Sequence, residues 1–391
     1  MQASHPRRTI RAVENITHSL VGAALAELAL PPAATPVTRR AFFAAGIVAA
    51  NLPDADLLYS GITAPPLGYL LHHRGYTHTL VGLIGLALIF ALVARIPAVR
   101  RAIGPPRRRF AVLVGLALLS HIVLDSWNSY GVHPFWPFDN RWFYGDAIFI
   151  AEPWLWVLLG CAVALNTRRP ALRAIVAALL VALVVALRWF GQVDTGVLTA
   201  LLIAAAFYTA ILSRFALRTR AQVALGATAL FVAGMFGASH VVAARGRSEV
   251  ALAPGARVVD VVTDARMGDP LCWTALVIAR NSSADDYAMT RGSMPLVNSV
   301  RCGAPARGQV VWTTSVHQSI RALRHLERDD CRVHAWLQFG RAPVIEGETI
   351  GDFRFGGAER GNFTAMSIAP PIGACPQHLT NWTFPRADLL D

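Results

Sequence analysis

Residues 171–190 read ALRAIVAALLVALVVALRWF, a run of 20 residues in which Arg173 and Arg188 are the charged members. A helix rises 1.5 Å per residue, so about 20 apolar residues are needed to cross the hydrocarbon core of a bilayer, which is about 30 Å thick. The stretch therefore predicts a transmembrane helix.

Comparable apolar runs recur up to about residue 244 and not beyond it. The chain is 54% hydrophobic and 15% charged, whereas a soluble domain is about 25% charged. The runs lie at about 16–30, 41–58, 79–98, 110–126, 148–166, 171–190, 195–213 and 221–243. We therefore predict an all-α polytopic membrane domain of about eight transmembrane helices over residues 1–244, with the short first two runs partly buried among the others.

The basic side chains are all Arg, and they gather in some of the connections between these runs. Residues 1–244 hold 20 Arg and 9 acidic residues, whereas the remainder holds 16 Arg and 15 acidic residues. The Arg clusters lie at 39–40, 95–109, 168–173 and 214–220. Arg-rich short loops stay in the cytoplasm, so the pattern indicates topology rather than nucleic-acid binding. It places 59–78, 127–147, 189–194 and the tail outside; Arg7, Arg8 and Arg11 depart from it.

The tail, residues 245–391, has a different texture. Runs such as 256–263, 272–279 and 333–339 favour β-strands, and clusters of Gly, Pro, Asn and Asp separate them. We predict a small, soluble, mainly β domain on the extracytoplasmic side. Such a location allows one or two disulfides among the four tail cysteines, with three possible complete pairings, although four unrelated thiols remain the alternative. These cysteines are Cys272, Cys302, Cys331 and Cys375.

Histidines and acidic residues gather in a few short stretches of the membrane half. His121 and Asp125 are four residues apart in a helical run, so both project from one face. His73 and His78 bracket a turn before the third run, and His18 lies near the start of the first. Asp54 and Asp56 follow Pro53, where an extended backbone would aim both the same way. The alternating topology brings these stretches to one membrane face.

Ionisable groups at membrane depth are costly and usually functional. Each residue alone has an ordinary structural explanation, such as a helix cap or an i,i+4 hydrogen bond, but their joint placement favours metal binding. Imidazole and carboxylate ligands suit Zn²⁺, Mn²⁺ or Fe²⁺. More ligands are present than one catalytic zinc needs, so one or two ions are expected. Arg74 is then a candidate to hold a phosphate or carboxylate oxygen of a substrate.

At this point the sequence resembles a known family, the YdjM-type membrane-bound metal-dependent hydrolases. The motifs that carry the resemblance are Asn15-Ile-Thr-His18, Pro53-Asp-Ala-Asp56, His73-Arg-Gly-Tyr-Thr-His78, His121-Ile-Val-Leu-Asp125, Asn128-Ser-Tyr-Gly131 and Asp146-Ala-Ile-Phe-Ile-Ala-Glu-Pro153. The resemblance covers about residues 15–153 and implies a multi-pass protein of the bacterial inner membrane. It implies metal-site roles for His18, Asp56, His73, His78, His121 and Asp125. Glu152 stands where Asp is expected before Pro153.

The sequence-based hypothesis is a hydrolase that uses metal-activated water at the membrane interface, with Asp54 or Asp146 as the general base. A lipid ester or phosphoester is the expected substrate class, because such a site meets lipid headgroups first. Two alternatives stay open: a metal-ion or proton transporter, and a non-catalytic envelope protein with a structural metal. The lipid bilayer is the expected partner, and the sequence leaves the substrate, the metal and the oligomeric state undetermined.

Overall fold

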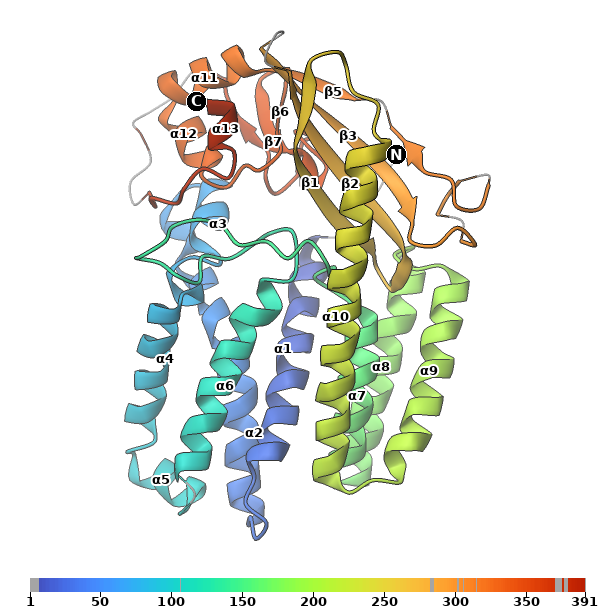
Figure 1. Ribbon diagram of the computed structural model, residues 1–391. Helices are drawn as coiled ribbons and strands as arrows, with labels where there is room; N and C mark the ends of the chain where they lie inside the picture. Colours follow the sequence, from blue (N-terminus) through green and yellow to red (C-terminus); the bar gives the residue numbers. More distant parts are fainter. Residues whose placement is uncertain are drawn as a thin grey trace.

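A computed structural model describes residues 7–105, 107–281, 285–300, 302–304, 306–313, 315–369, 375 and 379–390, without the side chains of 7–14. A bundle of helices forms one half, and two antiparallel sheets with three short helices form the other (Figure 1). The bundle helices are α1 (Arg7–Ala29), α2 (Pro36–Asn51), α4 (Leu80–Val93), α5 (Pro97–Ile103), α6 (Arg107–Asp125), α7 (Pro153–Asn166), α8 (Pro170–Trp189), α9 (Thr195–Ser213) and α10 (Leu217–Glu249). Short helical segments follow α2: η1 (Leu52–Leu58), η2 (Ser60–Ile62), α3 (Leu67–His72) and η3 (Tyr76–His78).

Local sequence explains several of the helix starts. Thr35 caps α2 by accepting a hydrogen bond from Thr38, and Pro36 begins the helix. Glu152 and Pro153 repeat this arrangement at α7, and Asp194 caps α9. A side-chain acceptor satisfies one of the free N–H groups of the first turn, and Pro has no N–H to satisfy.

Each predicted apolar run lies in or overlaps a helix, but fewer helices qualify as independent spans. Within the described residues, four segments are long and apolar enough to cross a membrane: Pro36–Ile62, Pro170–Trp189, Thr195–Ser213 and Leu217–Glu249. The pair Leu67–His78 and Leu80–Val93, bent by 66°, brings the number to five if it counts as one span. Among the others, α7 has 14 residues and α6 begins with three Arg. The structure thus supports four or five spans, and the prediction of about eight is not confirmed.

Helices α1 and α2 pack unusually closely, and this contact positions two of the predicted site segments. A Cβ placed on Gly22 of α1 would lie 2.4 Å from the carbonyl oxygen of Gly46 on α2. Small residues allow helix backbones to approach in this way. The contact holds the segment that carries His18 against the helix that leads into Asp54 and Asp56.

The tail contains the predicted strands, together with some helix. β1 (Ala256–Arg266), β2 (Asp269–Asn281), β3 (Asp286–Pro295) and β4 (Val311–Trp312) follow one another across the first sheet, and β5 (Val316–Ser319) also pairs with β3. The second sheet joins β6 (Pro343–Glu346), β7 (Thr349–Asp352) and β8 (Met366–Ser367). The remaining elements are α11 (Ile320–Asp329), α12 (Cys331–Leu337), η4 (Phe353–Phe355) and α13 (Ala387–Leu390). Disulfides join Cys272 to Cys302 and Cys331 to Cys375.

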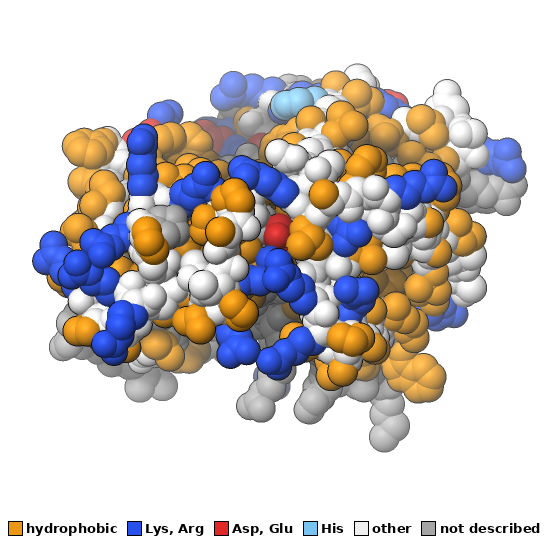
Figure 2. Space-filling model, turned by 90° about the horizontal axis from the view of Figure 1, so that it is seen from below, with side chains coloured by type: hydrophobic (Ala, Val, Ile, Leu, Met, Phe, Trp, Pro, Cys, Tyr) orange, Lys and Arg blue, Asp and Glu red, His pale blue; other side chains and the backbone are white. Residues whose placement is uncertain are grey.

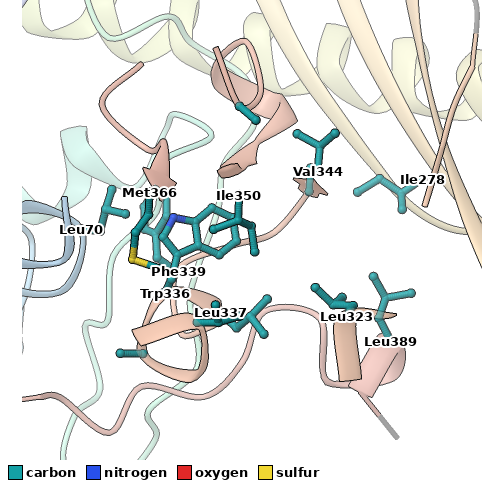
Figure 3. Close-up of a cluster of buried hydrophobic side chains, with 14 of the residues drawn as sticks. Leu70, Ile278, Leu323, Trp336, Leu337, Phe339, Val344, Ile350, Met366 and Leu389 are labelled. Carbon is teal, nitrogen blue, oxygen red and sulfur yellow. The ribbon is translucent and has the colours of Figure 1, made fainter. Parts of the chain in front are cut away.

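The core of the tail is continuous with part of the membrane half. Leu70 of α3 belongs to the same buried cluster as Trp336, Phe339 and Met366 (Figure 3). Two indole N–H groups reinforce the junction: Trp382 donates to the carbonyl of Leu71 at 3.0 Å, and Trp142 of the loop after α6 donates to that of Gln338 at 2.7 Å. The tail is therefore packed directly on α3 and on this loop, at one end of the bundle (Figure 1).

The opposite end of the bundle is rich in Arg. Figure 2 shows the molecule from that end, with basic side chains (blue) spread over the surface and few acidic ones (red). The connections α1–α2, α4–α6, α7–α8 and α9–α10 all lie there (Figure 1), and the predicted Arg clusters are in these connections or in the adjoining helix ends. The rule for Arg-rich loops predicts that this end faces the cytoplasm and that the tail faces outward, and this orientation stays a prediction.

Reporter fusions test this orientation. We expect a fusion after residue 104 to give a cytoplasmic signal, and fusions after residues 140 and 260 to give extracytoplasmic signals. Alkaline phosphatase and green fluorescent protein report the two compartments in opposite senses, so each fusion carries its own control. A cytoplasmic signal after residue 140 would invert the orientation.

Candidate metal centre

The candidate site lies at the tail-facing end of the bundle, where four segments meet. α1 supplies His18, η1 supplies Asp54 and Asp56, the turn 73–78 supplies two histidines, and α6 supplies His121 and Asp125. All of these side chains except Asp54 are buried. The Asp54 side chain is 12% exposed, which makes it the most accessible member of the group.

Asp54 and Asp56 point in different directions, which corrects the expectation of an extended backbone. Pro53 lies in the 3₁₀ helix η1, in which three residues complete a turn, so residues two apart do not share a face. Asp54 Oδ1 faces His78 Nε2 and His121 Nε2, at 3.5 and 3.4 Å. Asp56 instead contacts His73 Nδ1 at 3.0 Å and His78 Nδ1 at 3.1 Å.

Four ligand atoms converge on one point: His78 Nε2, His121 Nε2, Asp54 Oδ1 and Asp125 Oδ2. Asp125 Oδ2 lies 3.1 Å from His78 Nε2 and 3.3 Å from His121 Nε2, and the two Nε2 atoms are 3.0 Å apart. Ligands at about 2.0–2.1 Å from a tetrahedral zinc are separated by about 3.3–3.4 Å. The distances between these ligand atoms in the structure, 3.0–3.5 Å, are close to that value, so the four atoms could surround one such ion.

The contacts of the Nδ1 atoms of His78 and His121 determine which nitrogen of each ring is free to bind a metal. His121 Nδ1 lies 2.7 Å from the carbonyl oxygen of Ala50, which can only accept, so Nδ1 carries the proton. His78 Nδ1 faces the Asp56 carboxylate in the same way. In their neutral forms both Nε2 atoms then present lone pairs to each other, and neither can donate a hydrogen bond. Asp125 Oδ2 is likewise buried without a hydrogen-bond donor. A cation between these atoms would satisfy all of them, so the residues fit a metal ion.

Asp56 acts as an anchor for this arrangement. Its Oδ2 accepts hydrogen bonds from the backbone N–H of Arg74 at 2.9 Å and from the hydroxyl of Thr77 at 3.0 Å. Arg74 has a φ of 58°, a left-handed conformation that is uncommon for a residue with a side chain. The carboxylate therefore holds a strained turn that presents His73 and His78.

The structure places Arg74 beside a candidate ligand. Its guanidinium is buried and contacts Asp125 Oδ1 at 3.2 Å, and it donates to the Asp125 carbonyl and to Asn128 Oδ1. These contacts orient Asp125, and the contact of Arg74 with a substrate stays a prediction. His18 supports the same carboxylate, with Nε2 at 3.3 Å from Asp125 Oδ1, and its ring stacks on that of His121.

His73 belongs to a second, smaller group. With Asp54 and Asp56 it places three potential ligand atoms within 4.8 Å of one another. Asp54 is common to both groups. The described residues thus offer one four-atom site and an adjoining three-atom set, which leaves the number of ions at one or two.

Asp146 does not join either group, so its placement gives no support to its predicted role as a base, which stays a prediction. Its carboxylate binds Arg341 of the tail at 2.9 Å, and burial raises its pKa. Glu152 is also structural in position, because it caps α7 and accepts from Gly268 N at 3.4 Å. Burial raises the pKa of Glu152 to about 8. Both acids connect the loop before α7 to the tail.

A cleft of about 780 Å³ lies between the bundle and the tail, next to the site. Tyr69, whose ring stacks on His73, and Asn128, which binds Arg74, form part of its wall. A narrow cavity lined by His18 and Asp125 shares Asn128, Phe149 and Ile150 with the cleft. The cleft also contains Asp264 of the tail, whose pKa burial raises to about 7.

The sequence did not reveal the tail's share of this cleft. Arg354, Phe355, Glu359 and Phe363 line it from the tail. The run Gly351-Asp-Phe-Arg-Phe-Gly contains Arg354 and Phe355 and resembles part of the family's C-terminal domain, but nothing in it indicates a cleft. Two motifs of the family resemblance also contribute to the wall: Asn128 and Tyr130 lie in one, and Phe149 and Ile150 lie in the other.

Comparison with known proteins places these features in a family. Residues 13–194 match the family described as YdjM inner membrane protein. The chain is also 31% identical over 169 residues to the inner membrane protein YbcI of Escherichia coli strain K12, an alignment that covers 36% of this chain and 90% of that protein. No solved structure matches the chain. The matched region includes all of the candidate metal ligands, and the chain belongs to the YdjM family of inner membrane proteins.

Proposed function

We propose that this protein is a metal-dependent hydrolase of the inner membrane whose site opens toward the extracytoplasmic side. One observation carries the proposal: two imidazole Nε2 atoms and two carboxylate oxygens converge beside a cleft large enough for a substrate. The two Nε2 atoms are 3.0 Å apart, and each lies 3.1–3.5 Å from both carboxylate oxygens. A divalent ion held there would lower the pKa of a coordinated water and polarise a carbonyl or phosphoryl oxygen.

The chain's own residues divide the remaining work. Asp56 and the Ala50 carbonyl hold the two imidazoles in the required tautomer. Arg74 and His18 hold Asp125 from its other oxygen. We assign proton transfer to Asp54, the most exposed of the four, because water can reach its carboxylate. In that arrangement His78, His121 and Asp125 would be the three protein ligands, and a water would take the fourth position.

The position of the cleft supports a lipid ester or phosphoester as substrate. It lies where the helical bundle meets the tail, so an acyl chain can remain in the bilayer while a headgroup enters. Aromatic walls from Tyr69, Phe355 and Phe363 suit the apolar part, and Asn128 and Asn362 offer amide groups for the polar part.

A cleft-filling variant tests this function. We expect Ala365→Trp, which narrows the cleft, to lower kcat/KM for a short-chain phospholipid by about tenfold or more, equivalent to about 1.4 kcal/mol. The metal content should not change, because Ala365 belongs to neither group of potential ligands. Ala253→Trp, at an exposed tail position outside the cleft, is the matched control.

Two outcomes would replace the proposal with another function. Metal-loaded protein that hydrolyses neither phospholipids nor nitrophenyl esters and phosphates would favour a structural metal. Metal flux into proteoliposomes that is lost with His121→Ala would favour transport. Equal activity in Ala365→Trp and the control would remove the cleft from the proposal.

A further inference from the structure

A further cavity, with a volume of about 660 Å³, is lined by residues of α4, α5 and α6 and of the connections between them. α5 lies at the end of the bundle opposite the tail, far from the candidate metal centre (Figure 1). Small side chains at helical spacing leave space between α4 and α6 there: Ala87 and Ala91 on α4, Ala94 at its end, and Ala111 and Gly115 on α6. The walls are therefore apolar along the length of the helices.

Three arginines from three different elements line the mouth of this groove. Arg95 follows α4, Arg100 lies on α5, and Arg107 begins α6. All three side chains are exposed. Among the described residues, no carboxylate forms an ion pair with any of them, whereas Arg39 at the same end is paired with Glu27 at 2.6 Å.

We propose that this groove binds an anionic phospholipid of the bilayer, with its phosphate on the three guanidinium groups and an acyl chain along α4 and α6. Charge complementarity selects the headgroup, because guanidinium groups match phosphate oxygens in geometry and charge. The apolar walls select a lipid over a soluble phosphate. Basic pockets between membrane helices are suited to such headgroups.

Removal of the three charges tests the headgroup site in the full-length protein. Native mass spectrometry would follow binding of dioleoyl phosphatidylglycerol and, for comparison, dioleoyl phosphatidylcholine. We expect one phosphatidylglycerol to bind preferentially, and Arg95→Gln, Arg100→Gln and Arg107→Gln together to weaken it by about a hundredfold, since each Arg contributes about 1 kcal/mol.

A matched variant distinguishes a site from general attraction to a basic surface. Arg40→Gln, Arg101→Gln and Arg108→Gln remove the same charge from exposed positions at the same end that do not line the groove. This variant should retain the preference for phosphatidylglycerol. Equal losses in the two triple variants would overturn the proposal.

Substitutions that fill the groove test whether an acyl chain occupies it, and they leave the charge of the protein unchanged. A Cβ on Gly115 or on Gly85 meets no atom within 4 Å, so either position accepts a larger side chain, but Gly115 alone of the two lines the groove. We expect Gly115→Leu to weaken phosphatidylglycerol binding and Gly85→Leu to leave it unchanged. If glycerol 1-phosphate displaces the lipid fully and Gly115→Leu has no effect, the groove is a site for a soluble anion and the lipid proposal fails.

Discussion

Purified protein is expected to lose most of its bound divalent metal when His78 is replaced by Ala, and again when His121 is. Each change removes one of four converging ligand atoms, and the imidazole Nε2 is already fixed as the free nitrogen by Asp56 or by the Ala50 carbonyl. Elemental analysis of the wild-type chain should give at least one equivalent. Metal that remains at wild-type content in both variants would exclude this site.

A variant outside the four-atom site tests how much the orientation of His78 contributes to metal binding. Asp56→Asn leaves all four converging atoms in place but weakens the group that orients His78. Residues that orient a metal ligand in this way typically change affinity by about 10–100-fold. His240→Ala, at an exposed position on α10, is the matched control and should keep full metal content. The expected order of metal affinity is therefore wild type and His240→Ala, then Asp56→Asn, then His78→Ala.

The second large effect is expected at Arg354, which ties the tail to the loop after α6. Its guanidinium binds both oxygens of Asp352, at 3.0 and 2.8 Å, and donates to the carbonyls of Ser129 at 2.6 Å and Phe339 at 3.1 Å. The side chains of Arg354 and Asp352 are 1% and 0% exposed. Arg354→Ala leaves a buried carboxylate without its charged partner, which costs about 3–5 kcal/mol.

Denaturant unfolding of the tail measures this loss, with fluorescence from Trp336 and Trp382 as the probe because both are buried in its core. Arg354→Lys should recover part of the stability, since an ammonium keeps the charge but cannot bind both carboxylate oxygens in parallel. Arg360→Ala, at an exposed position, should leave the transition unchanged. A shift in Arg354→Ala no larger than that in Arg360→Ala would show that the ion pair does not hold the tail in place.

The candidate ligands could be identified before the structure because their signal is local. His121 and Asp125 share a helix face by spacing alone, and the turn between His73 and His78 is short enough to keep both near one point. The apolar runs follow from the same kind of information, since composition over about 20 residues decides whether a segment prefers lipid. These features depend on neighbours along the chain, and family membership confirmed their interpretation as parts of an inner membrane protein.

The roles of individual charged residues depended on partners distant in sequence. Arg74 binds Asp125, 51 residues away, so it orients a candidate ligand. Asp146 is bound by Arg341 of the tail, whereas Asp54 joins the ligand group. The sequence could not distinguish the roles of these two acids, because the role of a carboxylate depends on which cation the fold places next to it.

The sequence was sufficient to predict a helical membrane half, a β-sheet tail and a set of residues able to bind a metal, because periodicity, hydropathy and residue chemistry are properties of single segments. Contacts in three dimensions were needed to show which imidazole nitrogen is free, how Asp54 and Asp56 divide between two neighbouring groups, and that the tail forms one wall of the cleft. Those outcomes depend on close approach between segments far apart in the chain. The energy of each such contact depends on distances and burial that no single segment specifies.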